Sequence, residues 1–214
     1  MGKIINRLLS DICTNIGYTK KGDLFIKPVS NDISLTIFFN LASRQIKGHV
    51  LVAPFIGLQY HNVERLVRDV SQSEWIPEHT STIDEHIGYI MPIHTYTEWH
   101  FVEQEYNHNS SLQSLKNTIK KYFEVRDLKK SLVKYSDIYH KLFSDIEKII
   151  EYIENNKQWG SANYELYRRL PILYYLANRK QKGIDFINHA LNNGYCEADM
   201  IYTNTYIENF NKLP

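Results

Sequence analysis

Histidine exchanges protons near neutral pH more readily than any other side chain, and five of this chain's nine histidines fall between residues 79 and 108. The intervals between these five are seven, eight, six and eight residues. None of these intervals matches the compact spacing of a zinc motif, so we expect surface or helix-capping roles, with no bound metal and no cofactor. The five are His79, His86, His94, His100 and His108.

The nucleophilic side chains lack the local sequence that activates a nucleophile. The chain has no Gly-x-Ser-x-Gly motif, and its nine glycines are scattered singly rather than grouped in a phosphate-binding loop. Cys13 and Cys196 have no catalytic flanking motif, and we expect both to be buried structural thiols. We therefore predict no catalytic residues and a protein that is not an enzyme.

One enzymatic alternative stays open. A small hydrolase or metal-dependent enzyme would use the histidines and acids of residues 79–108 for acid–base chemistry. Neighbouring carboxylates on a loop rarely converge on one substrate atom, and for that reason we rank binding above catalysis. The acid pairs are Asp84-Glu85 and Glu103 with Glu105.

The distribution of charge is the strongest functional signal in the sequence. Between Arg68 and Lys116 lie 47 residues without a single Lys or Arg, although the whole chain holds 25 and carries a net charge of only +1. This window holds eight acids, interleaved with six Trp, Tyr and Phe residues. The acids are Asp69, Glu74, Glu78, Asp84, Glu85, Glu98, Glu103 and Glu105, and the aromatic residues are Trp75, Tyr89, Tyr96, Trp99, Phe101 and Tyr106.

An acidic and aromatic surface suits the capture of a basic protein, because acids steer the encounter and aromatic rings supply anchoring area. Such a partner could be a nuclease whose nucleic-acid groove is blocked. We predict that the partner contacts Glu74, Asp84, Glu85, Tyr96, Glu98, Trp99, Glu103, Glu105 and Tyr106.

The sign of the charge reverses directly after this window. Residues 116–134 hold seven Lys and Arg against two acids, a local charge of +5. This segment gives a second alternative, a nucleic-acid-binding module, although we expect nucleic acid to be the less favoured partner. For this basic segment we favour the other alternative, that it lies near the acidic window and the two neutralise each other within the fold.

The apolar pattern predicts the elements that position these residues. Residues 4–16 have helical spacing and end at Gly17, while Lys21-Gly22-Asp23 has turn chemistry. Residues 33–41 alternate as a strand with one buried face, and residues 48–58 form a further strand in which Pro54 marks an edge or a bulge. Residues 63–70 predict a helix, and residues 88–91 a short strand.

From about residue 111 the pattern is helical. An apolar stripe recurs over residues 138–153, a second one over 164–177 is kinked near Pro171, and a third one over 184–191 is capped by Gly194. The fold class is therefore α+β, with an N-terminal helix on a small, mostly antiparallel sheet. We expect an α+β domain over residues 1–110, with a helical region over 111–214 packed against it.

No apolar run has the length of a signal peptide or a membrane span. We accordingly expect a soluble, cytoplasmic protein with reduced thiols.

The beginning of the chain resembles the DUF4304-like bacterial domains. The resemblance is carried by Gly17-Tyr18-Thr19-Lys20-Lys21-Gly22-Asp23-Leu24-Phe25, then by Gly57-Leu58, Val63-Glu64-Arg65-Leu66, Gly88-Tyr89-Ile90-Met91-Pro92 and Trp99. It covers about the first half of the chain. Some proteins of this kind look like immunity proteins encoded beside polymorphic or contact-dependent toxins. The resemblance thus implies a bacterial protein that binds and neutralises a cognate toxin.

Overall fold

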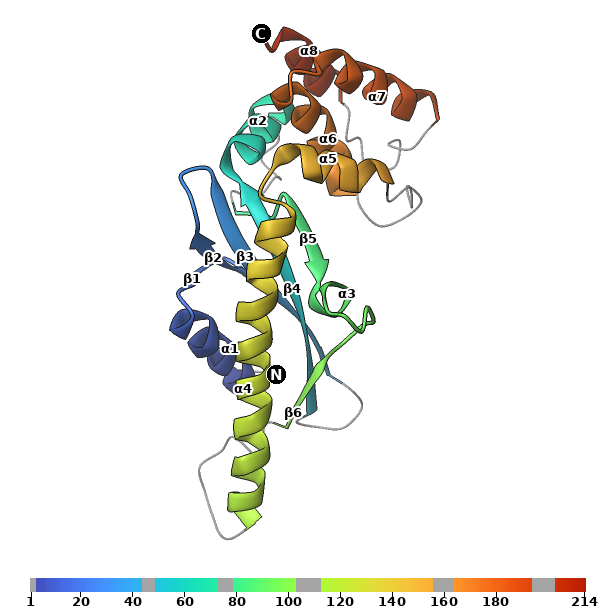
Figure 1. Ribbon diagram of the computed structural model, residues 1–214. Helices are drawn as coiled ribbons and strands as arrows, with labels where there is room; N and C mark the ends of the chain where they lie inside the picture. Colours follow the sequence, from blue (N-terminus) through green and yellow to red (C-terminus); the bar gives the residue numbers. More distant parts are fainter. Residues whose placement is uncertain (1–2, 44–48, 73–78, 103–112, 156–163, 194–202) are drawn as a thin grey trace. The chain divides into compact units, whose positions relative to one another are not determined.

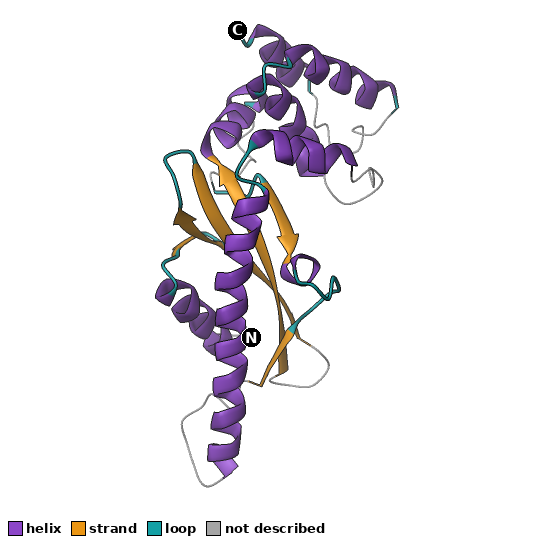
Figure 2. Ribbon diagram, viewed as in Figure 1, coloured by secondary structure: helices purple, strands orange, loops and turns teal. Residues whose placement is uncertain are grey.

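The structure is a computed structural model that describes residues 3–43, 49–72, 79–102, 113–155, 164–193 and 203–214 (Figure 1). It has an N-terminal helix, an antiparallel sheet and a C-terminal helical region, which confirms the predicted α+β class (Figure 2). The chain forms two compact units. The sheet unit comprises residues 1–29, 34–57 and 84–141, and the helical unit comprises residues 30–33, 58–83 and 142–214. These boundaries differ from a single division near residue 110.

The sheet unit begins with helix α1 (Lys3–Asn15), whose apolar face is buried. Gly17 follows α1 with φ of 89°, a left-handed conformation that glycine adopts without strain. Strands β1 (Thr19–Lys21) and β2 (Leu24–Pro28) then form a hairpin in which Lys21 pairs with Leu24. Gly22 has φ of 59°, as a two-residue hairpin turn requires. The predicted helix end and turn are both confirmed.

Six strands make one sheet in the order β1-β2-β3-β4-β5, with β6 also paired to β4. The remaining strands are β3 (Ile33–Ser43), β4 (His49–Tyr60), β5 (Ile83–His86) and β6 (Trp99–Val102). The prediction of one buried face for β3 is wrong over its first half, where Ser34 and Thr36 are as deeply buried as Leu35 and Ile37. Small hydroxyl side chains that have interaction partners can be covered on the second face.

Pro54 does not mark a sheet edge. It lies within β4, which has β3 on one side and both β5 and β6 on the other. The pairing with β6 covers only residues 49–52, so Pro54 lies beyond the part of β4 that β6 contacts. An interior strand tolerates proline where one partner strand has ended.

Two more helices complete the sheet unit. The short strand predicted at residues 88–91 is instead helix α3 (Ile87–Ile90). Helix α4 (Gln113–Leu142) buries a stripe that includes Leu128, Leu132 and Tyr135. The Tyr18 hydroxyl, just after α1, donates to Ser136 Oγ of α4 at 3.0 Å, and both helices lie against the sheet (Figure 1).

The helical unit contains α2 (His61–Ser71), α5 (Ile146–Asn155), α6 (Tyr164–Leu176), α7 (Lys180–Asn192) and α8 (Asn204–Lys212). Helix α6 packs against α2, α5 and α7, and α8 packs against α2. Gly183 permits the close approach in this unit, because a Cβ there would lie 2.8 Å from Phe210 Cζ. The helix predicted over residues 63–70 is confirmed as α2.

Two details of the predicted helices need correction. The stripe over residues 138–153 is divided between two helices, because α4 ends at Leu142 and α5 begins at Ile146. Asp145 Oδ1 accepts a hydrogen bond from Glu147 N at 3.0 Å, which caps the new helix. Pro171 lies inside α6, which continues through it. The predicted cap Gly194 lies outside the described residues, and Asn193 is the C-terminal cap of α7.

Candidate partner-binding surface

The structure describes five of the nine predicted contact residues, and all five belong to the sheet unit. Asp84 and Glu85 lie on β5, Tyr96 and Glu98 precede β6, and Trp99 begins β6. The other four predicted contacts lie outside the described residues. These four are Glu74, Glu103, Glu105 and Tyr106.

Trp99 is buried, with only 8% of its surface exposed. Its indole Nε1 donates to Asp127 Oδ2 of α4 at 3.0 Å. This hydrogen bond joins the acidic window to the basic segment through a neutral donor rather than an ion pair. Trp99 therefore holds β6 against α4 and presents no ring to a partner.

The exposed apolar side chains of this region gather in residues 87–97, which we call the docking loop. Ile93 is 67% exposed, Tyr96 50% and Tyr89 42%. All of residues 92–96 are exposed. Large apolar side chains rarely cluster on a surface without a role in binding, so the docking loop is the candidate site.

Hydrogen bonds hold the docking loop in one conformation. The Thr95 N–H donates to Gly88 O at 3.1 Å, the His94 N–H donates to Met91 O at 2.9 Å, and His94 Nδ1 lies 2.8 Å from Tyr89 O. Gly88 is required for this closure, because a Cβ there would fall on the Thr95 carbonyl oxygen. The loop is therefore preorganised, and a partner would not have to order it on binding.

His86 contacts the docking loop from its buried side. It is buried, and its Nδ1 accepts a hydrogen bond from Gly88 N at 3.2 Å at the start of α3. An accepting Nδ1 places the proton of the neutral ring on Nε2. The His86 ring stacks on Tyr96, with centroids 4.3 Å apart and planes at 12°. The helix-capping role predicted for the histidines thus holds for His86.

Burial lowers the pKa of His86 below its ordinary value of 6.5, against the opposing effects of the Thr97 backbone and the Glu98 charge. Among the atoms that the structure describes, His86 Nε2 makes no hydrogen bond. Because Nδ1 accepts the hydrogen bond from Gly88 N, it carries no proton, and the neutral ring is the form that fits this site.

Aromatic rings continue from His86 across the sheet. The Phe55 ring of β4 meets His86 edge-on at 5.2 Å, and it stacks on Phe38 of β3 at 4.7 Å. One row of rings thus runs from β3 through β4 and β5 to Tyr96 in the docking loop. The ring contacts in this row hold the exposed Tyr96 side chain in place.

Acids flank the docking loop at both ends. Asp84 is exposed, Glu85 and Glu98 are partly exposed, and the Glu85 carboxylate accepts a hydrogen bond from His86 N at 2.9 Å. No Lys or Arg occurs in the chain between Arg68 and Lys116. The loop and its flanking acids thus combine fixed aromatic rings with negative charge. Tyr96, Asp84, Glu85 and Glu98 are among the predicted contact residues, whereas the exposed Tyr89 and Ile93 were not named and Trp99 is buried.

Two polar sites of the structure were missed from the sequence. His49 of β4 lies beside His100 of β6, with Nδ1 and Nε2 2.8 Å apart. His49 falls outside the histidine-rich window, and only the register between β4 and β6 could have linked the two. In the part of the chain that the structure describes, no group of three or more His, Cys, Asp or Glu residues could hold a metal ion.

The second missed site is a buried network in the helical unit. Arg169 Nε donates to Glu64 Oε1 at 2.8 Å, and Arg169 Nη2 donates to Glu64 Oε2 at 3.0 Å. Thr82 Oγ1 donates to Glu64 Oε1 at 2.7 Å and accepts from Tyr60 N at 2.8 Å. Both charged side chains are at most 2% exposed. This network joins α2 and α6 and has a structural role.

Three comparisons, with protein-family models, with curated proteins and with solved structures, found no match to this chain. Of the helices described, none has the length and apolar character that crossing a membrane requires. The site must therefore be interpreted from its own geometry and charge.

Proposed function

We propose that this chain is a non-enzymatic immunity protein, which binds a basic protein toxin through the docking loop and blocks the toxin's active site. The observation that supports this proposal is the preorganised, exposed and aromatic docking loop flanked by Asp84, Glu85 and Glu98. The resemblance to bacterial immunity proteins supplies the idea that the partner is a toxin.

The chemistry of the docking loop favours a basic partner. Tyr89 and Tyr96 offer ring faces on which a guanidinium or ammonium group can rest, and the flanking carboxylates attract the same groups. Ile93 supplies an apolar contact between them. A nuclease groove, rich in Lys and Arg, has the matching charge.

The mechanism needs no bond chemistry in this chain. The acids would steer the toxin into contact and the rigid rings would hold it, so that the bound chain covers the basic groove sterically and electrostatically. Because the docking loop is already ordered, little conformational entropy would be lost on binding.

Charge reversal tests this proposal. The double variant Asp84→Lys, Glu98→Lys and the wild-type chain would be used to capture partners from native cells at low and high salt. The matched control is Asp185→Lys, Glu208→Lys, which changes the net charge equally on exposed acids of the helical unit. Captured proteins would be identified by mass spectrometry and expressed alone.

We expect the wild type and the control to retain one stoichiometric basic protein that is toxic when expressed alone. The Asp84→Lys, Glu98→Lys variant, which changes the acids that flank the docking loop, should lose it while keeping the circular dichroism spectrum of the wild type. Equal capture by all three chains, or a captured protein that is not toxic, would contradict the proposal.

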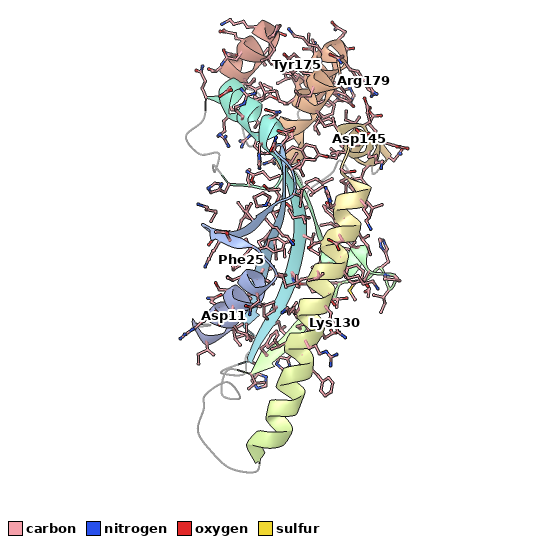
Figure 3. The ribbon with its side chains drawn as sticks, turned by 60° about the vertical axis from the view of Figure 1, so that its left-hand side comes forward. Asp11, Phe25, Lys130, Asp145, Tyr175 and Arg179 are labelled. Atoms are coloured by element: carbon pink, nitrogen blue, oxygen red, sulfur yellow. The ribbon has the colours of Figure 1, made fainter. Side chains whose placement is uncertain are left out.

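One observation favours a second candidate, a nucleic-acid-binding module. Arg126, Lys130 and Lys134 are exposed at four-residue intervals on α4, and Lys129 lies beside them. Lys130 is labelled on this helix in Figure 3. A mobility shift of generic oligonucleotides that weakens steeply with salt would support this role, and no shift at low salt would exclude it.

A further inference from the structure

Two histidines that are 51 residues apart in the chain lie side by side on β4 and β6. His49 Nδ1 and His100 Nε2 are 2.8 Å apart, and the ring centroids are 4.8 Å apart. The antiparallel register pairs His49 with Val102 and Leu51 with His100. The two histidines therefore occupy neighbouring diagonal positions on one face of the sheet.

This face is open to solvent at the histidine pair. Alternation along β6 places Trp99 and Phe101 on the other, buried face, while His100 is exposed and His49 is partly exposed. An ion from solution can reach both rings. The strands that carry them are paired by backbone hydrogen bonds, which limits how far the rings can separate.

We infer that His49 and His100 form a two-histidine chelate for a divalent transition-metal ion of the zinc, nickel and copper class. Metal–imidazole bonds of about 2.0–2.1 Å at angles between tetrahedral and square place two ligand nitrogens about 2.9–3.4 Å apart. The observed separation of 2.8 Å is close to this range, and each ring would turn so that its lone pair points at the shared metal ion rather than at the other ring.

The proton balance of binding is simple. At a separation of 2.8 Å, one facing nitrogen carries a proton and donates a hydrogen bond, which the other facing nitrogen accepts. When a metal ion binds, that ring becomes the other tautomer, with its proton on the outward nitrogen, so both facing lone pairs point at the metal. The proton thus moves from the facing to the outward nitrogen of the same ring, and water fills the remaining positions on the metal.

The chemistry of the pair selects the class of ion. Imidazole suits zinc, copper and nickel, whereas calcium and magnesium prefer oxygen ligands. Two protein ligands leave the geometry to the metal, so affinity should follow the intrinsic order, with copper above nickel and zinc. Calcium should not compete.

Metal titration of the full chain tests this inference. Isothermal titration calorimetry with zinc chloride or nickel chloride alone would compare the wild type with His49→Gln and His100→Gln. His94→Gln is the matched control, because it removes an exposed histidine of the same unit that lies outside the pair. Melting curves in a chelator would establish that each variant folds.

We expect each pair variant to lose roughly 10–100-fold in affinity, because one chelating ligand loses the effective concentration that the other provides. The control should bind as the wild type does. The metal should also raise the melting temperature of the wild type and of His94→Gln, but not that of His49→Gln or His100→Gln. Equal affinity in all four chains, or no binding by the wild type, would overturn the inference.

A second readout needs no substitution. Diethyl pyrocarbonate modifies accessible histidines, and mass spectrometry locates the modified residues. Zinc should protect His49 and His100 together and leave His94 reactive. Modification of the pair at an unchanged rate in saturating zinc would overturn the inference even where a variant fails to fold.

Discussion

The two compact units use charged and aromatic side chains in opposite ways. The helical unit buries Glu64 and Arg169 and gives each charge its hydrogen-bonding partners. The sheet unit displays Tyr89, Ile93 and Tyr96 at its surface on a loop that internal hydrogen bonds already order. Buried charged groups that have their hydrogen-bonding partners stabilise the fold, whereas exposed side chains on an ordered loop are available to a partner.

The largest effect should come from breaking the buried ion pair. Arg169→Met leaves the Glu64 charge buried without its partner, so the free energy of unfolding should fall by roughly 3–5 kcal/mol. The matched control is Arg179→Met, which removes the exposed pair with Glu147 and should cost about 0–1 kcal/mol. Urea denaturation measures both. Equal losses of unfolding free energy in the two variants would show that the buried ion pair stabilises the fold no more than the exposed one.

The next effect should come from Gly88→Ala in the docking loop. The added methyl group meets the Thr95 carbonyl oxygen, so the loop must open, at a cost of about 1–3 kcal/mol. Ile93→Ala, in the same loop but largely exposed, should leave the free energy of unfolding unchanged. Hydrogen exchange of the loop amides should quicken only in Gly88→Ala. Unchanged exchange in that variant would show that the loop is not held as described.

A smaller effect should appear on lowering the pH. Burial lowers the pKa of His86 in the folded chain, so the unfolded chain takes up a proton first as the pH falls below the ordinary value of 6.5. The contribution of His86 to stability is therefore complete above this pH and is lost below it. Denaturation at a series of pH values measures the slope.

His86→Asn sharpens this test, because asparagine can still accept the hydrogen bond from Gly88 N but does not titrate. We expect its unfolding free energy to depend less on pH between 5 and 7 than that of the wild type, pH values that span the ordinary pKa of 6.5. Identical slopes would mean that His86 does not titrate in this range.

The smallest change concerns reactivity alone. Burial raises the pKa of the Cys13 thiol to about 12, so the native thiolate is scarce and covered. In a Cys196→Ser variant, a thiol reagent should modify Cys13 only after unfolding. Rapid modification of the folded chain would contradict the burial of this cysteine.

Local sequence was enough to predict the elements whose ends depend on neighbouring residues. Gly17 ends α1 and Gly22 turns the first hairpin because glycine alone takes positive φ without strain. The four residues of α3 could not be assigned in this way, since so short an apolar run fits a strand or a helix. The cap by His86 and the contact between Gly88 and Thr95 decide its structure.

The candidate site was predicted in its composition but only partly in its residues. Charge and aromatic content along residues 69–106 indicated a binding surface, but the burial of Trp99 depends on how α4 packs, which periodicity does not give. The pairs His49–His100 and Glu64–Arg169 join residues 51 and 105 positions apart. Such contacts depend on register and tertiary packing, and they leave no local signal in the sequence.

The most direct test of the central claim is the affinity of the basic partner for two variants that each add one positive charge. Ile93→Lys changes the docking loop, and Leu191→Lys changes an exposed apolar position of the helical unit. With the partner captured by the wild-type chain, calorimetry should give a Kd at least about tenfold weaker for Ile93→Lys alone. Equal Kd values for the two variants would show that the docking loop does not bind the partner.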